Sequence, residues 1–302
     1  MNGDLNKVIS ALSEVILEKP EQIKLALCSL LCRGHLLIED LPGMGKTTLS
    51  HSLANVLGLS YRRVQFTSDL LPSDITGTAI YNRQEQSFEF HPGPIFSQVL
   101  LADEINRASP KTQSALLEAM EEHQVTVDGV SHKLPSPFFV IATQNPQHQS
   151  GTHPLPESQL DRFFMRISLG YPSLQAETQL IKSANKNRRT QQELSTVIDA
   201  ERLARYQDEL NTITISDSII EYILRLVSLT RNTQQFSDPL SPRASIALAA
   251  ASKAYAFISG RDFVLPDDVQ AVFTPVCAHR LGVDSRNGEQ VMEQVLQQVS
   301  VH

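Results

Sequence analysis

The sequence has few of the features that secreted and membrane-spanning proteins need. Its 302 residues include three cysteines and no tryptophan. An odd number of cysteines gives no disulfide framework, and the chain has no run of about 18 apolar residues that could cross a bilayer. The amino terminus has acidic residues in place of the basic and apolar regions of a signal peptide. These absences predict a cytoplasmic protein without membrane insertion.

Clustered positive charge and closed metal sites are also missing. With 26 Lys and Arg against 33 Asp and Glu, the formal net charge is -7. A nucleic-acid surface needs clustered Lys and Arg, so we do not expect DNA or RNA as a partner. The basic residues Lys186, Arg188 and Arg189 are interpreted as a solvated face. Cys28 and Cys32 would share a helix face, but no further zinc ligands are spaced nearby, which favours helix packing.

The first half of the chain alternates β-rich apolar runs with helical patterns, which predicts βαβ units around a parallel sheet. The candidate strands cover residues 35–39, 61–66, 99–102, 138–143 and 163–167. Beyond Pro172 only helical patterns follow, for example over residues 219–224. We therefore expect an α/β domain over residues 1–172 and an all-α domain over residues 173–302.

A glycine-rich loop follows the first candidate strand. Residues 40–47, DLPGMGKT, match the phosphate-loop pattern except at Asp40, where the general pattern has glycine. Glycine lets backbone N–H groups approach the phosphates of ATP, Lys46 counters their charge, and the Thr47 hydroxyl binds Mg2+. The helix that follows adds its dipole. The predicted nucleotide-binding residues are Pro42, Gly43, Met44, Gly45, Lys46, Thr47 and Thr48.

Two acids and an amide follow the later strands. Asp103 and Glu104 come directly after the apolar run at residues 99–102. An ATPase needs one acid for the Mg2+ shell and one to polarise the attacking water, and we assign Asp103 to the first role and Glu104 to the second. Asn145 follows the strand at residues 138–143, where its amide would reach the γ-phosphate. Taken alone, the two acids could be a solvated loop, and Asn145 with Pro146 a simple turn.

A helix and a hairpin follow the acids. Ser109 and Pro110 have the N-cap and first-turn chemistry of a helix start. After that helix, apolar residues alternate around Asp128-Gly129, the strongest short signal for a two-residue hairpin turn. We expect a hairpin over residues 123–136 that projects from the sheet layer.

Six separated blocks of the sequence form one recognisable set. They are HLLIEDLPG at 35–43, LPSDITG at 71–77, LADEINRA at 101–108, LPESQLDRF at 155–163, SPRA at 241–244 and GRDF at 260–263. Together they resemble the MoxR family of AAA+ ATPases along nearly the whole chain. The resemblance implies an AAA+ P-loop core with a parallel sheet flanked by helices, followed by a small all-α lid domain. It also implies ATP hydrolysis with Mg2+, and Asp is common in this family at the first loop position.

The resemblance implies roles for single residues as well. Asn145 is similar to sensor 1, Arg162 to the finger that reaches a neighbouring subunit's γ-phosphate, and Arg243 to sensor 2. Arg162 could instead be a surface ion-pair partner. Arg243 stands just after a helix start, where a cation is unfavourable unless an anion compensates it, which favours phosphate contact. A finger acting on a neighbour implies a homo-oligomer, in this family a hexameric ring.

Residues 68–94 would be the family's helix-2 insertion. Its aromatic residues Tyr81, Phe88 and Phe90 are candidate contacts for a substrate, or they pack the insertion's own hairpin. The helical half departs from the family pattern at Leu265, which stands where a hydroxyl N-cap is usual. This departure predicts a weak helix start.

The family resemblance favours an ATP-hydrolysing remodelling chaperone that acts on a protein client. It implies a von Willebrand factor A domain protein as partner, in complex maturation or metal-cofactor insertion. One alternative is a DNA-associated motor, because related ring ATPases with the same insertion act on nucleic acid, but the acidic charge disfavours it. The other is a nucleotide-dependent scaffold without turnover, which the intact Glu104, Asn145 and Arg162 disfavour.

Overall fold

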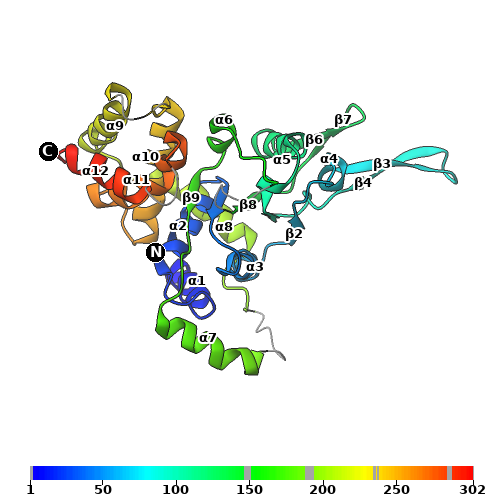
Figure 1. Cartoon of the computed structure of the whole chain (residues 1–302), viewed down its shortest axis with the longest axis horizontal. Coiled ribbons are helices and arrows are strands. Elements are labelled where there is room, and N and C mark those ends of the chain that lie inside the picture. The colour runs from blue at the N-terminus through cyan, green and yellow to red at the C-terminus, as the bar shows by residue number, and fades with distance from the viewer. Residues whose placement is uncertain are drawn as a thin grey trace.

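A five-stranded parallel sheet forms the centre of the molecule (Figure 1). The computed structural model describes residues 3–145, 151–187, 194–233, 236, 238–283 and 288–301. The sheet order is β2-β5-β8-β1-β9. The strands are β1 Leu36–Glu39, β2 Tyr61–Gln65, β5 Val99–Asp103, β8 Phe139–Gln144 and β9 Met165–Ile167. Each lies within two residues of its predicted bounds, so the predicted α/β class with a parallel sheet is confirmed.

Both faces of the sheet are buried. Along β1, the side chains of Leu36 and Ile38 enter one hydrophobic cluster and that of Leu37 enters another. This alternation follows from the pleat of a strand, and it explains why β1, β5 and β8, the strands inside the sheet, are apolar on both faces until their last one or two residues. The first face is covered by α1 Gly3–Ser13, α2 Pro20–Leu31 and α3 Lys46–Val56, and the second by α4 Pro72–Thr76 and α5 Pro110–Glu122.

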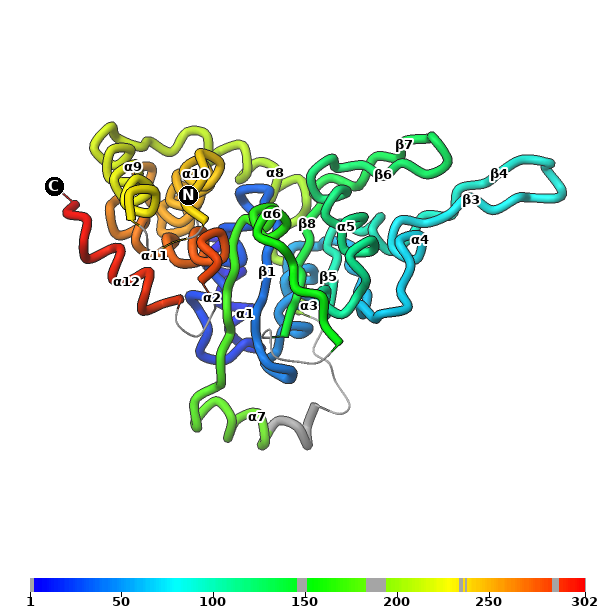
Figure 2. Tube along the Cα trace, turned by 45° about the horizontal axis from the view of Figure 1, so that its top comes forward, coloured from blue at the N-terminus to red at the C-terminus, as the bar shows by residue number. Residues whose placement is uncertain are grey.

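Two hairpins extend from the second layer, away from the carboxyl-terminal helices (Figures 1 and 2). They are β3 Gly77–Asn82 with β4 Ser87–Pro92, and β6 Gln124–Val127 with β7 Val130–Lys133. Asp128 and Gly129 turn the second hairpin with φ values of 50° and 81°, as a type I′ turn requires. Phe90 stacks on His132 with ring centroids 3.8 Å apart, so the two hairpins are joined near their bases.

The carboxyl-terminal part of the described chain is helical. Its helices are α7 Leu174–Asn187, α8 Ala200–Glu209, α9 Asp217–Asn232, α10 Pro242–Ile258, α11 Pro266–Cys277 and α12 Gly288–Gln298. Short 3-10 turns lie at η1 Ile105–Arg107, η2 Leu210–Thr212 and η3 Ala278–Leu281, and α6 Glu157–Leu160 precedes β9. None of the helices within the described ranges has the length and apolar character to span a membrane.

One hydrophobic cluster runs from the sheet into these helices. It contains Leu5 of α1, Leu36 of β1, Leu248 of α10 and Val269 of α11. The helices of the predicted lid are therefore not packed around a core of their own. The boundary between residues 172 and 173 stays a prediction.

An acid in the first turn of α11 bonds back to the residue that begins the helix. The Leu265 side chain cannot accept a hydrogen bond, but the Asp268 carboxylate accepts one from the Leu265 N–H at 2.8 Å. Arg261 donates two further bonds to Asp268, at 2.5 and 2.6 Å. Asp268 satisfies the N–H of Leu265 but not the first-turn N–H groups that a hydroxyl at Leu265 would serve, so the weak helix start stays a prediction.

Candidate nucleotide-binding site

The phosphate loop lies at the carboxyl end of β1 and leads into α3. Gly43 and Gly45 have φ values of 85° and 89°, which residues with a side chain rarely adopt. Apart from its chain neighbours, a Cβ on either glycine would meet no atom of the described residues within 4 Å, so space beside the loop is open. The first N–H groups of α3 lack partners within the helix and carry its positive dipole. These features suit a phosphate.

Lys46 is buried and turned back on the loop. Its Nζ donates hydrogen bonds to the backbone oxygens of Asp40 at 2.6 Å and Leu41 at 3.2 Å. Burial lowers the pKa of the Lys46 ammonium below its usual value. The ammonium therefore has neutral carbonyls as its hydrogen-bond partners, which phosphate oxygens would outcompete because charge-assisted hydrogen bonds are stronger.

The carboxylate of Asp40, at the first loop position, is bonded to the segment that follows β9. It accepts hydrogen bonds from the Ser168 hydroxyl at 2.8 Å and from the N–H groups of Leu169 at 2.5 Å and Gly170 at 3.2 Å. These three donors stabilise the charge of the Asp40 carboxylate at the position where the general pattern has glycine. Asp40 also ties the loop to the segment that joins β9 to α7.

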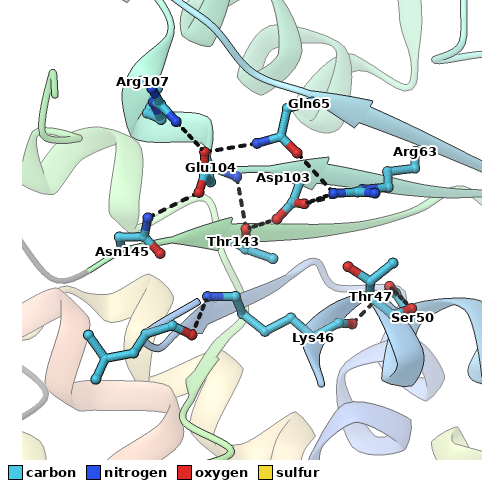
Figure 3. Close-up of polar contacts among 11 residues, drawn as sticks. Lys46, Thr47, Ser50, Arg63, Gln65, Asp103, Glu104, Arg107, Thr143 and Asn145 are labelled. Carbon is cyan, nitrogen blue, oxygen red and sulfur yellow. Dashed lines mark hydrogen bonds and ion pairs between the residues drawn. The ribbon is translucent and has the colours of Figure 1, made fainter. Parts of the chain in front are cut away.

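Asp103 and Thr143 occupy the ends of neighbouring strands (Figure 3). The Thr143 hydroxyl donates to Asp103 Oδ1 at 2.6 Å and accepts from the Glu104 N–H at 2.8 Å. Arg63 of β2 donates to Asp103 Oδ2 through NH2 at 2.7 Å. Both carboxylate oxygens of Asp103 are therefore held from the side of the sheet.

Glu104 is the next acid, with a φ of 56° that is unusual for a residue with a side chain. Its Oε1 accepts from Asn145 Nδ2 at 3.2 Å, which brings two predicted site residues together. Its Oε2 accepts from Gln65 at 2.8 Å and Arg107 at 2.9 Å (Figure 3). Asn145 Oδ1 is buried without a hydrogen-bond partner among the described residues, so it is free to accept one from a water or ligand.

Sequence reasoning did not identify Arg63, Gln65, Arg107 or Thr143 as site residues. Arg63 and Gln65 stand two apart on β2, so they lie on the same face of an edge strand. A polar pair at that spacing was the available signal. It identifies no partner, because the acids that the pair contacts lie about forty positions further along the chain.

The residues present suit Mg2+. Thr47 supplies a hydroxyl at the start of α3 and Asp103 a carboxylate, and Mg2+ favours one or two such oxygens together with phosphates and water. Within the described ranges, no group of three or more His, Cys, Asp or Glu residues forms a metal site. A site completed by phosphate oxygens agrees with both observations.

Arg162 and Arg243 lie at the amino edge of the sheet, the side on which the parallel strands begin, whereas the phosphate loop and the two acids lie at its carboxyl edge, where the strands end. Arg162 stands just before β9 begins, and its NH1 donates to the Leu117 carbonyl of α5 at 3.0 Å. Helix α5 has 13 residues, so it carries its last turn about 20 Å from the edge where Asp103 and Glu104 lie. Arg243 pairs with Glu121 in that last turn, at 3.5 Å. The structure does not bring these two arginines together with Lys46 and Glu104.

A glycine loop at a helix start, two acids and an amide at one edge of this parallel sheet define a P-loop ATPase of the AAA class. Residues 35–165 match the "ATPase family associated with various cellular activities (AAA)", and residues 228–299 match the "AAA lid domain". The predicted ATPase activity is in agreement with this class.

Individual proteins narrow the class. The chain is 37% identical to the chaperone MoxR1 of Mycobacterium tuberculosis over 98% of this chain and 82% of that protein. It is 46% identical to the uncharacterized YeaC of Bacillus subtilis, over 92% and 86%. A crystal structure of a candidate ATPase from Cytophaga hutchinsonii matches with a TM-score of 0.90 at 36% identity, over 99% and 95%. The chain belongs to the MoxR family of AAA ATPases, as its sequence motifs predict.

Proposed function

We propose that this ATPase is a ring-forming remodelling chaperone that uses ATP and Mg2+ to change the conformation or assembly of a protein client. The observation that carries the proposal is the separation of the two sets of polar residues. The nucleotide-binding groups lie at the carboxyl edge of the sheet, and the half-buried Arg162 and the exposed Arg243 lie at the amino edge. The similarity to a protein named chaperone MoxR1 supports action on proteins.

Each residue at the carboxyl edge has a task in hydrolysis. The loop amides, Lys46 and the dipole of α3 would bind the phosphates, and Thr47 and Asp103 would hold Mg2+, which neutralises charge on the β- and γ-phosphates. Glu104 would accept a proton from the attacking water. Asn145 contacts Glu104 and has a free acceptor oxygen, so it would orient that water against the γ-phosphate.

A second copy would complete this site. Because Arg162 and Arg243 are too far from their own phosphate loop, a phosphate that they contact belongs to a neighbouring subunit. A contact between two different edges of identical subunits is heterologous, and such contacts form a ring where the rotation between subunits closes. The family resemblance favours six subunits and a von Willebrand factor A domain protein as partner.

The inserted hairpin β3–β4 is the proposed contact with the client. Tyr81 and Phe88 pair across the hairpin with ring centroids 5.3 Å apart, yet they remain 50% and 73% exposed. Phe90 differs because it is stacked on His132 and makes an edge-to-face contact with Phe96. The exposed pair supports a client-contact role for Tyr81 and Phe88, whereas Phe90 packs the insertion.

The decisive variant is Glu104→Gln. It should bind ATP with wild-type affinity and lose hydrolysis, because water activation and phosphate binding are separate roles. Glu118→Gln is the matched control, an exposed glutamate on α5. Rings should form in ATP by sedimentation velocity, and the Glu104→Gln ring should hold a protein client. Monomers at every nucleotide concentration, or hydrolysis that DNA stimulates and protein does not, would refute the proposal.

A further inference from the structure

The side chain of Arg280 joins the helical part of the molecule to the loop that carries Arg162. Arg280 lies in η3, and its side chain is only 5% exposed. Its Nε donates to Asp161 Oδ1 at 2.7 Å, and its NH2 donates to the carbonyls of Phe163 at 2.9 Å and Asp161 at 3.4 Å. Its NH1 donates to Phe164 O at 3.2 Å and to Val276 O. One guanidinium therefore fixes the residues on both sides of Arg162.

Asp161 receives a second arginine. Its Oδ2 lies 3.5 Å from NH1 of Arg243, at the start of α10. The carboxylate therefore stands between a buried guanidinium and an exposed one. Because Arg280 takes Oδ1, the orientation of Oδ2 toward Arg243 is fixed.

Glu121 closes this arrangement on the side of α5. It pairs with Arg162 and, at 3.5 Å, with Arg243. Asp161 and Glu121 thus hold Arg162 and Arg243 side by side, although one arginine belongs to the sheet layer and the other to the helical part. Both remain accessible, at 32% and 60% exposed, whereas Arg280 is buried. In Figure 2, α6, which ends just before Asp161, lies on the same side of the molecule as α10, and α7 lies at the opposite end of the sheet.

We propose that Arg280 and Asp161 are positioning residues that hold Arg162 and Arg243 as one unit for the nucleotide of a neighbouring subunit. This inference rests on the proposed action of these arginines between subunits. Arg280 contributes geometry as well as charge, because its planar fork serves a carboxylate and several carbonyls at once. A lysine at this position would keep the charge but donate from one nitrogen.

The inference is tested with Arg280→Lys and Asp161→Asn. A displacement of the arginines by about 1 Å should lower hydrolysis roughly tenfold to a hundredfold, while ATP affinity stays within about twofold of wild type. Val272→Ala is the control for a purely structural defect, since Val272 is buried in α11 and makes none of these contacts. Its hydrolysis should fall only in proportion to the loss of folded protein, followed by circular dichroism.

Mixed rings show on which side of the interface the defect lies. A Glu104→Gln subunit has no working site but supplies intact arginines, so mixing it with Arg280→Lys should restore hydrolysis in Arg280→Lys sites. Mixing Arg280→Lys with Arg162→Ala should restore none, because both lack a good donor. Restoration in the second mixture and none in the first would overturn the inference. Failure of Glu104→Gln to restore Arg162→Ala would instead overturn the proposed action between subunits.

Discussion

The two edges of the sheet hold charged groups in different ways. At the carboxyl edge, Lys46, Asp103 and Glu104 are bonded inward by backbone carbonyls and by polar side chains of neighbouring strands. At the amino edge, the half-buried Arg162 and the exposed Arg243 share Glu121 as a carboxylate partner. The carboxyl edge is therefore arranged to receive a small anion, whereas the amino edge presents cations outward.

The largest expected effect is at the carboxyl edge. Lys46→Ala should weaken ATP binding by about a thousandfold, because it removes the buried cation that would pair with a multiply charged ligand. The measurement is titration with a fluorescent ATP analogue. Lys111→Ala, an exposed lysine on α5, should leave the affinity unchanged. Equal loss of affinity in both variants would show that the effect does not depend on the cation at the carboxyl edge.

The next effect is at the amino edge. Arg162→Ala should lower the hydrolysis rate about a hundredfold with ATP affinity nearly intact, since it removes one cation from the transition state. Excess variant should also poison wild-type protein through mixed rings. Steady-state kinetics over a range of mixing ratios checks this. Activity that falls only in proportion to dilution would mean that Arg162 acts within its own chain or has no catalytic role.

A smaller effect concerns Mg2+ at the carboxyl edge. Arg63→Met should lower the Mg2+ concentration needed for half-maximal binding of an ATP analogue several-fold. The reason is that the Arg63 guanidinium competes with a cation for Asp103 Oδ2. Arg62→Met is the matched control, an exposed neighbour on the same strand. A higher Mg2+ requirement in Arg63→Met would show instead that Arg63 orients Asp103 for Mg2+ binding.

At neutral pH the smallest effect comes from His35, at the amino edge. Its Nδ1 accepts from the Val140 N–H and its Nε2 donates to Met120 O, and burial lowers its pKa from 6.5 to about 4. Below pH 6.5 the unfolded chain binds this proton more readily, so stability present above pH 6.5 is lost as the pH falls toward 4. The loss is about 3 kcal/mol.

Urea unfolding of wild type and His35→Asn between pH 4 and 7 measures this component. The variant should be less stable at pH 7 and should lose stability less steeply as the pH falls. Some pH dependence should remain, because burial also lowers the pKa of His279. Parallel curves for the two proteins would show that His35 does not titrate as its burial predicts.

Local chemistry made much of the fold predictable. Short apolar runs located the strands, Asp128-Gly129 located a hairpin, and Ser109-Pro110 located the start of α5, where Ser109 accepts the Thr112 N–H. The positive φ values of Gly43 and Gly45 follow from the same kind of local requirement. Each of these signals is contained within a few consecutive residues.

Other features depend on residues that meet only through the tertiary fold. The three donors on Asp40 come from residues 168–170, and the partner of Arg63 is Asp103. Periodicity carries no record of which strands become neighbours, so these contacts could not be predicted. The separation of Arg162 and Arg243 from the phosphate loop has the same origin, because it depends on the direction of α5 and β9.

The stack of Phe90 on His132 has a mechanical consequence. Hairpin β6–β7 continues directly from α5, and α5 begins a few residues after Glu104. The stack places the base of β3–β4 against the hairpin that α5 leads into, and the strands of β3–β4 have six residues each and extend about 20 Å. Because this arm is long, a small change of angle at its base would move Tyr81 and Phe88 much further than it would move the residues around Glu104.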